Sequence, residues 1–559
     1  MPITNSKKIT ILILFILLQL LPFINKPFHV DDPFYIKMAE QIINDPLRPY
    51  SFSINWSGEM RNVWSYMEAT FPPLIPSYIS LIIKLFGKCE FMLHLMFLIF
   101  PLSAGISMFF ISKRFKAPPL ISALLLVSTP VFLVMSTTLM LDIPLLALWL
   151  ISTQLFIKGT DDNNKLFLVL ASGFMALCVM TKYTGLLLLP ILYIYLLLNK
   201  KAVKYRFWLL PAILVFFSWC IHNLLIYGSI HFLHAGIHVG KGLTIHKLFS
   251  LLTFFSGIMI FPAFIIFSYK KNQLPALIII PFAVILLSVL LFKELLFIIL
   301  FTVLVSSTLI FLYKITISSL SNHCEKVSLP PNVLLCRTKH GGLPPQSVSS
   351  GKTSSMEKDP DMVFIFCWFL IIFLLNLIVE PWTASRYLIL CVPPSIIMLL
   401  KISTATIAGR RLKYTGIIMI TVTLLFGQLL NYSDYSWSRV YPEFAAYAGS
   451  KGYNKGYFLG HFGLQYYLEK EGMTALEVAK KDIVKGGYII TAILPDPQKP
   501  NDELLHKLEF IERKPYYSPM PLKLMSPHAR AGFYSSFWGI FPFGISTAPL
   551  EEFFIFRVK

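Results

Sequence analysis

Long apolar runs recur along this chain and limit what it can fold into. From the N-terminal end to about residue 430, stretches of roughly 16 to 22 apolar residues follow one another, and such stretches are the signature of membrane-spanning helices. Of the 559 residues, 55% are hydrophobic and only 14% are charged. This composition excludes an ordinary soluble globular protein and predicts a mainly α, polytopic membrane protein.

We predict about thirteen membrane spans, which place the basic clusters on the cytoplasmic side. The first apolar run, 9–24, is kept as an uncleaved span because no small-residue cleavage site follows it. Residues 74–86 are predicted to form an interfacial helix, because a crossing there would put the Lys113–Lys116 cluster outside. The remaining predicted spans are 91–111, 119–136, 142–157, 165–181, 185–198, 207–227, 248–267, 275–292, 294–313, 362–379, 387–400 and 414–430.

The chain changes character after its last predicted span. Residues 1–430 are predicted to form a transmembrane domain, and residues 431–559 a small α/β domain on the extracytoplasmic side, with a strand at 487–494 and a helix at 502–512. This C-terminal part holds 15 Lys or Arg and 13 Asp or Glu, so about +18 of the formal +20 belongs to the membrane part. Such loop charge orients spans, and we predict no nucleic-acid partner.

Two adjacent carboxylates, Asp31 and Asp32, lie in the predicted first outer loop, 25–90. They open an amphipathic run that ends near Ile43. Asp32 before Pro33 is typical of a helix start, with Asp as the N-cap and Pro at the first helical position. Asp31 then has no evident structural role, which makes it a candidate catalytic group.

Other charged residues are predicted on the same outer face. Asp142 stands at the start of a span, where it is either a functional acid or an interfacial N-cap. Lys182 and Arg386 occupy very short outer loops, against the usual charge bias, and either bind a phosphate or extend to lipid headgroups. Carboxylates and cations on one face suit group transfer from a phosphate-linked lipid.

Two further sequence patterns are weaker indications of a functional site. The predicted cytoplasmic loop, 315–361, contains Ser350-Gly351-Lys352-Thr353, but Gln346 stands where a phosphate-binding loop needs its first glycine. His231, His234 and His238 have a spacing that can hold zinc on a helix, although a polar loop or a substrate contact is favoured because no carboxylate is nearby.

The order of these features resembles that of the GT-C-type membrane glycosyltransferases. The similarity is to the branch that contains dolichyl-phosphate-mannose-protein mannosyltransferases and aminoarabinose transferases. It covers nearly the whole chain, and the order of the motifs is more specific than any one of them. The motifs are Asp31-Asp32 followed by Tyr35, Pro72-Pro73-Leu74, Lys113-Arg114-Phe115, Asp142 with Pro144, Thr181–Gly185, Arg386-Tyr387-Leu388 and Gly460–Tyr467.

The resemblance implies a transferase that uses a polyprenyl-phosphate sugar on the extracytoplasmic side of the cell (inner) membrane, with a protein, lipid or glycan acceptor. In such enzymes the first acid of the pair is the catalytic carboxylate, which matches Asp31, and Asp32 stands where a glutamate is usual. Some members bind a divalent cation beside the Pro-Pro element, where Glu68 is near but not adjacent. No other cofactor is implied.

From these residues we expect an inverting mechanism in which Asp31 is the general base. The candidate catalytic residues are Asp31, Asp32 and Asp142, and the candidate residues that bind the substrate and its lipid phosphate are Lys182, Arg386 and Tyr35. Two other classes compete. A transporter or flippase of lipid-linked sugars predicts internal symmetry and deep charges, and the second half of the sequence does not repeat the first. A receptor or scaffold leaves the outer acids unexplained.

Overall fold

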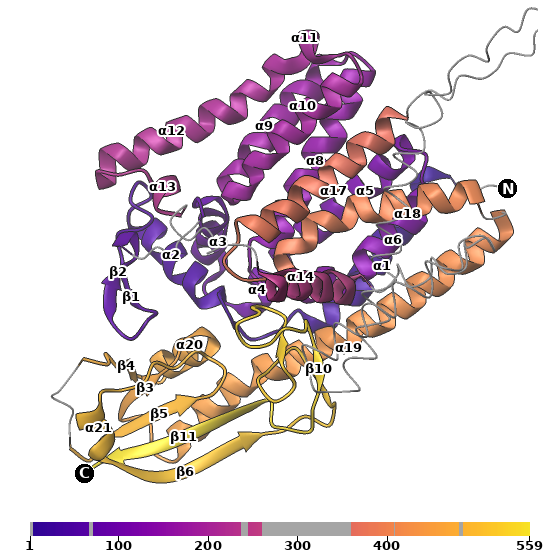
Figure 1. Ribbon diagram of the computed structural model, residues 1–559. Coiled ribbons are helices and arrows are strands. Elements are labelled where there is room, and N and C mark those ends of the chain that lie inside the picture. The colour runs from indigo at the N-terminus through magenta and orange to yellow at the C-terminus, as the bar shows by residue number, and fades with distance from the viewer. Residues whose placement is uncertain (1–3, 66–70, 236–243, 260–358, 407–408, 480–484) are drawn as a thin grey trace, which may run out of the picture.

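The computed structural model describes residues 4–65, 71–235, 244–259, 359–406, 409–479 and 485–559. Its helices form a bundle, and the C-terminal strands and loops lie against one end of it (Figure 1). Seven helical segments in the described residues are long and apolar enough to cross a membrane. They are Asn5–Phe23, Glu90–Arg114, Asp142–Asp161, Ala202–Tyr227, Pro360–Ile378, Ser385–Thr404 and Arg411–Ser450. The chain is therefore a multi-pass membrane protein.

The N-terminal half of the chain supplies most of the bundle. Shorter apolar helices accompany the long ones, at 74–86, 119–128, 165–181 and 183–198. The helices of this half, with η marking 3-10 turns, are α1 (Asn5–Leu20), η1 (Leu21–Phe23), α2 (Asp32–Asn44), η2 (Val63–Ser65), α3 (Leu74–Phe86), α4 (Glu90–Phe97), α5 (Ile99–Arg114), α6 (Pro119–Ser128), α7 (Pro130–Met135), α8 (Asp142–Asp161), α9 (Lys165–Thr181), η3 (Tyr183–Leu187), α10 (Leu188–Leu198), α11 (Ala202–Tyr205), η4 (Arg206–Leu209), α12 (Leu210–Tyr227), α13 (His231–Ala235) and α14 (Ile245–Ile258).

Helix α8 lies at the centre of the bundle, between α5 and α9. Most of its residues are apolar and buried, as expected for a helix at the centre of a bundle. Trp149 is completely buried and stacks on Trp368, with ring centroids 6.2 Å apart. Trp368 belongs to α17 (Pro360–Ile378), so the second half of the chain packs directly on this central helix.

Salt bridges join the helices at one end of the bundle. Arg114 at the end of α5 contacts Asp161 at the end of α8 and Asp361 at the start of α17, the latter at 2.9 Å. Lys201 binds the same Asp161 at 2.7 Å. These four positions come from four separate loop regions that the sequence assigns to the cytoplasmic side. The structure places them together at one end of the bundle, as expected for loops on one side of a membrane.

The long helix α19 (Gly409–Ser450) joins the bundle to the C-terminal part. Its first half packs on α6 and α7, and its second half packs on a sheet, where Phe444 stacks on Phe553 with centroids 3.6 Å apart. The predicted domain boundary at residue 430 falls inside this continuous helix. The other elements of this half are η8 (Ser385–Cys391), α18 (Val392–Thr406), α20 (Phe462–Lys470) and α21 (Asp502–His506).

The C-terminal part is built around a five-stranded mixed sheet with the strand order β4-β3-β5-β11-β6. Three two-stranded pairs, β1–β2, β7–β10 and β8–β9, complete the strand content of the described residues. The strands are β1 (Ser53–Asn55), β2 (Met60–Asn62), β3 (Gly456–Leu459), β4 (Thr474–Ala475), β5 (Tyr488–Ala492), β6 (Leu508–Tyr516), β7 (Leu522–Lys523), β8 (Met525–Ser526), β9 (Ala531–Gly532), β10 (Gly544–Ile545) and β11 (Glu551–Val558).

Most predicted elements are present, and two were wrong in extent. The strand expected at 487–494 is β5. The helix expected at 502–512 ends at His506, because residues 508–516 pair with β11 as strand β6. The span expected at 119–136 is two helices, since Thr129 leaves the helical conformation before Pro130. Residues 74–86 form a helix as predicted. The predicted spans 275–292 and 294–313, most of 248–267 beyond α14 and nearly all of loop 315–361 lie outside the described residues.

Candidate active site

The predicted outer-face residues meet at the end of the bundle opposite the ion cluster. Asp31 lies at the start of α2, Asp142 at the start of α8, Lys182 just after α9, and Arg386 at the start of η8. Asp31 accepts a hydrogen bond from Arg386 Nη1 at 2.7 Å. Lys182 Nζ lies 3.3 Å from Asp142 Oδ1. Residues that are up to 355 positions apart in the sequence thus form one charged cluster.

A small cavity opens beside this cluster. Its lining is partly charged and partly apolar, with Leu and Ile side chains of α8, α17 and η8. The polar and aromatic lining residues are Asp142, Lys182, Thr184, Asn376, Glu380, Arg386 and Tyr387. Arg386 therefore contacts Asp31 and the cavity at once.

Local backbone geometry positions the cations. In the turn after α9, Gly185 N–H donates to the carbonyl of Lys182 at 2.8 Å. A Cβ atom on Gly185 would come within 2.5 Å of the Cys178 carbonyl oxygen, so only glycine fits this turn. The ammonium group of Lys182 lies 4.7 Å from the centre of the Tyr387 ring, and the Arg386 guanidinium lies 5.3 Å from it. This aromatic ring supports both cations through cation–π contact.

The acid pair is arranged differently from the prediction. Helix α2 begins at Asp32, one residue earlier than expected, and Asp31 occupies the N-cap position without a capping bond from its side chain. Asp32 was wrongly assigned as the cap. Its carboxylate instead accepts the backbone N–H of Leu139 at 2.9 Å and that of His29 at 3.3 Å. It turns away from its own helix because these two donors are buried beside it.

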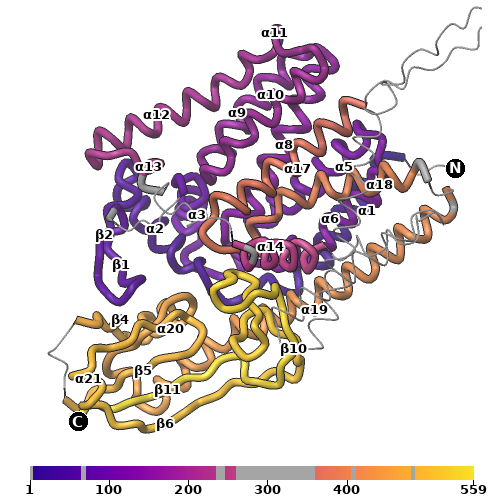
Figure 2. Tube along the Cα trace, in the orientation of Figure 1, coloured from indigo at the N-terminus to yellow at the C-terminus, as the bar shows by residue number. Residues whose placement is uncertain are grey.

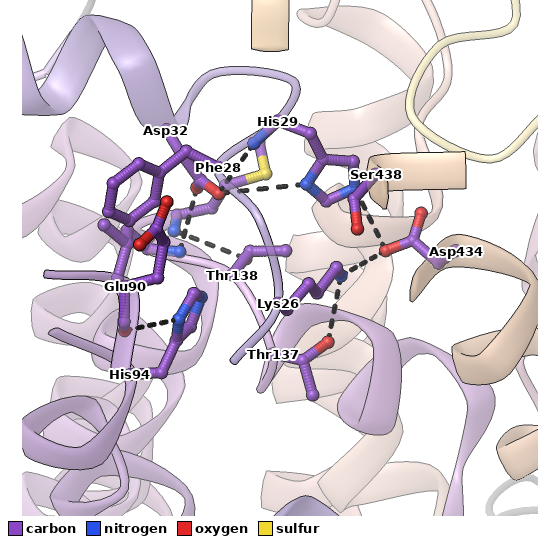
Figure 3. Close-up of polar contacts among 12 residues, drawn as sticks. Lys26, Phe28, His29, Asp32, Glu90, His94, Thr137, Thr138, Asp434 and Ser438 are labelled. Atoms are coloured by element: carbon purple, nitrogen blue, oxygen red, sulfur yellow. Dashed lines mark hydrogen bonds and ion pairs between the residues drawn. The ribbon is translucent and has the colours of Figure 1, made fainter. Parts of the chain in front are cut away.

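A buried ion network lies behind Asp32 (Figure 3). Lys26 binds Asp434 of α19, and both side chains are fully buried. His29 Nε2 lies 3.1 Å from the same carboxylate oxygen of Asp434, and Tyr534 donates its hydroxyl to that oxygen at 2.9 Å. The network fixes the loop that carries the acid pair against α19 and the C-terminal part.

The backbone before Asp31 is strained. Val30 has φ of 51°, in the left-handed region that β-branched residues rarely adopt. Such strain persists only where the surroundings impose it, and it gathers at functional sites. Here the imposing contacts are the buried bonds of His29 and Asp32 on either side.

Burial and neighbouring charges set the protonation of the site. Burial raises the pKa of Asp31, and Asp32 and Asp142 raise it further, while Arg386 and Lys182 oppose them. Burial also raises the pKa of Glu380 against the pull of the same two cations. For Lys182, burial lowers the pKa, but Asp142, Tyr387 and Glu380 together outweigh it, so the net direction is upward and the ammonium stays charged.

Tyr35 and His231 are aromatic neighbours of this region. Burial and the charge of Asp31 hold the pKa of Tyr35 well above its ordinary value, and its ring packs on Phe71 at 5.2 Å. His231 Nδ1 lies 2.8 Å from the Tyr183 hydroxyl, and its ring stacks on Tyr50 at 4.6 Å. The side chains of His234 and His238 lie outside the described residues.

The predicted metal ligand Glu68 also lies outside the described residues. In the part of the chain that the structure covers, no group of three His, Cys, Asp or Glu side chains is placed to hold a metal ion. The described donors near the acid pair are already engaged with one another. A divalent cation therefore stays a prediction from the resemblance alone, and no step below uses one.

Sequence reasoning missed several polar residues of this region. Lys26, His29, Asp434 and Glu380 were not assigned a role, although charges beside apolar helices are functional candidates by default. Thr184 was also missed. Its hydroxyl and Arg386 Nε are buried without a hydrogen-bond partner among the residues that the structure describes, and both residues line the cavity.

The comparisons with known proteins confirm the resemblance to GT-C-type membrane glycosyltransferases that the sequence indicates. Residues 70–227 match the family model described as dolichyl-phosphate-mannose-protein mannosyltransferase. The structure of ArnT from Cupriavidus metallidurans bound to undecaprenyl phosphate shares the fold, with a TM-score of 0.52, 11% identity, and coverage of 87% of this chain and 92% of ArnT.

Two other solved structures show weaker similarity. The Archaeoglobus fulgidus oligosaccharyltransferase has a TM-score of 0.47 at 12% identity, covering 87% of this chain and 67% of that one. The arabinofuranosyltransferase AftD from Mycobacteria has a TM-score of 0.45 at 10% identity, covering 100% of this chain and 40% of that one. No curated protein matches the chain by sequence.

Proposed function

We propose that this protein transfers a sugar from a polyprenyl-phosphate-linked donor to a protein, lipid or glycan acceptor on the extracytoplasmic side of the cell membrane. The observation that carries the proposal is the contact of Asp31 with Arg386 beside the cavity that Lys182 also lines. This arrangement places a candidate base, Asp31, beside two candidate phosphate-binding cations, Arg386 and Lys182. The matched family and the undecaprenyl phosphate bound to ArnT support this donor class.

The cations are proposed to receive the leaving phosphate. Within the described part of the chain, Arg386 Nε has no hydrogen-bond partner, and Thr184 offers a buried hydroxyl on the same cavity. Asp31, Asp142 and Glu380 lie around Lys182 and Arg386. These acids would repel the anionic phosphate if all three were ionised. The raised pKa of Glu380 favours its neutral form, which lowers that opposition. Tyr35, which stays a phenol, and Asp142, which holds Lys182, complete the proposed substrate contacts.

Asp31 is proposed as the general base of a single inverting displacement. The acceptor hydroxyl gives its proton to the Asp31 carboxylate while its oxygen bonds to the anomeric carbon. The bond from that carbon to the phosphate oxygen breaks, and polyprenyl phosphate leaves on the opposite face. Accessibility favours Asp31 for this role, because its side chain is 25% exposed whereas that of Asp32 is 1% exposed.

Reconstitution tests the function. The purified protein is placed in liposomes with polyprenyl-phosphate sugars extracted from the source membranes and with an acceptor fraction, and the release of free polyprenyl phosphate is measured. We expect release by the wild-type protein and a large loss in Arg386→Ala. Arg439→Ala is the matched control, since Arg439 is exposed and pairs with Glu443 on its own helix. Movement of intact lipid-linked sugar across the bilayer without release would instead support a flippase.

Two cell-based measurements complete the test. A reporter fused after Lys559 should be active outside the cytoplasm, and cytoplasmic activity would overturn the proposed orientation. Mass spectrometry of the envelope glycans and lipids of a deletion strain should show one lost sugar modification, which would identify both the sugar and its acceptor.

A further inference from the structure

A loop of the C-terminal part reaches the segment that carries Arg386. Ser385 N–H donates to the carbonyl of Phe533 at 2.9 Å, and Ser536 N–H donates to the carbonyl of Thr383 at 2.7 Å. Thr383 N–H in turn donates to Ser536 Oγ at 3.0 Å. Three hydrogen bonds thus join residues 533–536 to residues 383–385, immediately before Arg386.

The same loop reaches the segment that carries Asp31. Tyr534, between Phe533 and Ser536, donates its hydroxyl to Asp434 at 2.9 Å. Asp434 also binds Lys26 and His29, which belong to the segment that precedes Asp31. Tyr534 is only 4% exposed, so this contact is fully removed from solvent.

The loop is itself held to the bundle. Thr253 of α14 donates its hydroxyl to the carbonyl of Ile540 at 2.8 Å. A Cβ atom on Gly257, one turn further along α14, would come within 2.3 Å of Pro542. The loop therefore packs closely on this face of α14. In Figure 2 the yellow C-terminal loops lie directly against α14.

We propose that residues 533–536 are a positioning element for the active site, which holds the Arg386 loop through Ser536 and Phe533 and the Asp31 loop through Tyr534. The inference rests on the proposed function, because the site that residues 533–536 would position is the proposed active site. Asp31 and Arg386 come from loops that are 355 residues apart. A shared support fixes their separation where neither loop alone can, and catalytic groups need placement to within about 0.5 Å.

The test compares two neighbouring serines. Ser536→Ala removes the acceptor for Thr383 N–H. Ser535→Ala removes a hydroxyl whose bond in the described structure stays within its own loop, to Phe537 N–H at 3.2 Å. Both serines are half-buried, so the control matches in size and exposure. Tyr534→Phe is a second variant, which deletes one hydroxyl and leaves Asp434 with Lys26 and His29.

Two measurements are made on the full-length protein in detergent or liposomes. The first is hydrogen exchange of the peptide that contains residues 380–387. The second is the pH profile of sugar transfer from the extracted polyprenyl-phosphate donors. The charges that face Asp31 are Arg386, Asp32, Asp142 and Lys182. When Arg386 is less well held, the carboxylate loses stabilisation, and the acid limb of the profile moves to higher pH.

For Ser536→Ala we expect faster exchange in this peptide, an acid limb at higher pH, and a loss in transfer of about 2- to 10-fold, which is the worth of one hydrogen bond. Tyr534→Phe should lower transfer by a similar factor, and Ser535→Ala should match the wild type. A lower rate with an unmoved acid limb would mean a smaller folded fraction and would overturn the inference. A wild-type protein without transfer would overturn the proposed function, and unchanged exchange in Ser536→Ala would overturn the positioning contact independently.

Discussion

Asp31 and Asp32 are neighbours in the sequence, yet their side chains lie in two different regions. Asp31 is partly exposed, has one cationic partner and stands beside the cavity. Asp32 is buried, accepts two backbone N–H groups and adjoins a network of fully buried ions. The first arrangement leaves a carboxylate that can take a proton from a substrate. The second uses the same chemical group to fix loops, and it teaches that residue type alone does not identify the base.

The largest effect is expected in the buried network. Lys26→Met leaves Asp434 buried without its ammonium partner, and breaking a buried ion pair in this way costs about 3 to 5 kcal/mol. Thermal unfolding in detergent should show a large fall in the melting temperature or too little folded protein to purify. Lys88→Met is the control, because its pair with Glu40 is about half exposed and such pairs contribute about 0 to 1 kcal/mol. Equal melting temperatures for the two variants would contradict a stabilising role of the buried network.

A smaller effect, on rate rather than stability, is expected at the partly buried pair of Arg386 and Asp31. In the wild type, the planar guanidinium contacts Asp31 through Nη1, while its Nε has no partner in the described residues and can donate to a ligand. Arg386→Lys keeps the charge but loses this two-sided geometry. We expect transfer to fall by about 10- to 100-fold, the worth of one charged hydrogen bond, while the melting temperature changes little. If Arg386→Lys keeps the full rate, the guanidinium is not a phosphate ligand.

The smallest expected effect is a shift in pH dependence. Transfer needs an ionised Asp31, whose pKa is raised, so the acid limb of the wild-type profile should lie above the ordinary carboxyl value. The charge of Asp32 contributes to that rise. Asp32→Asn should therefore move the acid limb to lower pH, and a limb that moves to higher pH would contradict the assignment of Asp31 as the base.

The sequence predicts much of the bundle because membrane helices leave a strong local signal. The ranges of α3, α8, α9 and α17 follow from apolar runs and charged ends. The sequence also predicts that Asp31, Asp142, Lys182 and Arg386 share one face, because a charge beside an apolar run is costly without a partner. The structure brings these four residues into one cluster. These predictions rest on local patterns.

The failures depend on contacts between distant segments. Residues 508–512 were predicted to be helical, but they form a strand because β11, more than 40 residues further on, pairs with them. Asp32 fits a cap by its sequence, but the N–H of Leu139 takes its carboxylate. Nothing near Asp434 in the sequence indicates that Lys26 lies beside it.

The most direct test of the central claim compares Asp31→Asn with Asp32→Asn in single-turnover transfer, with each rate divided by the folded fraction. Asp31→Asn removes the base with little change in packing, and loss of a general base costs about 100- to 10,000-fold. Asp32→Asn places an amide donor against a backbone N–H and should lower the folded yield, yet the folded molecules should keep a measurable rate. The account predicts that only Asp31→Asn abolishes transfer per folded molecule. Full transfer by Asp31→Asn, or abolition by Asp32→Asn alone, would contradict it.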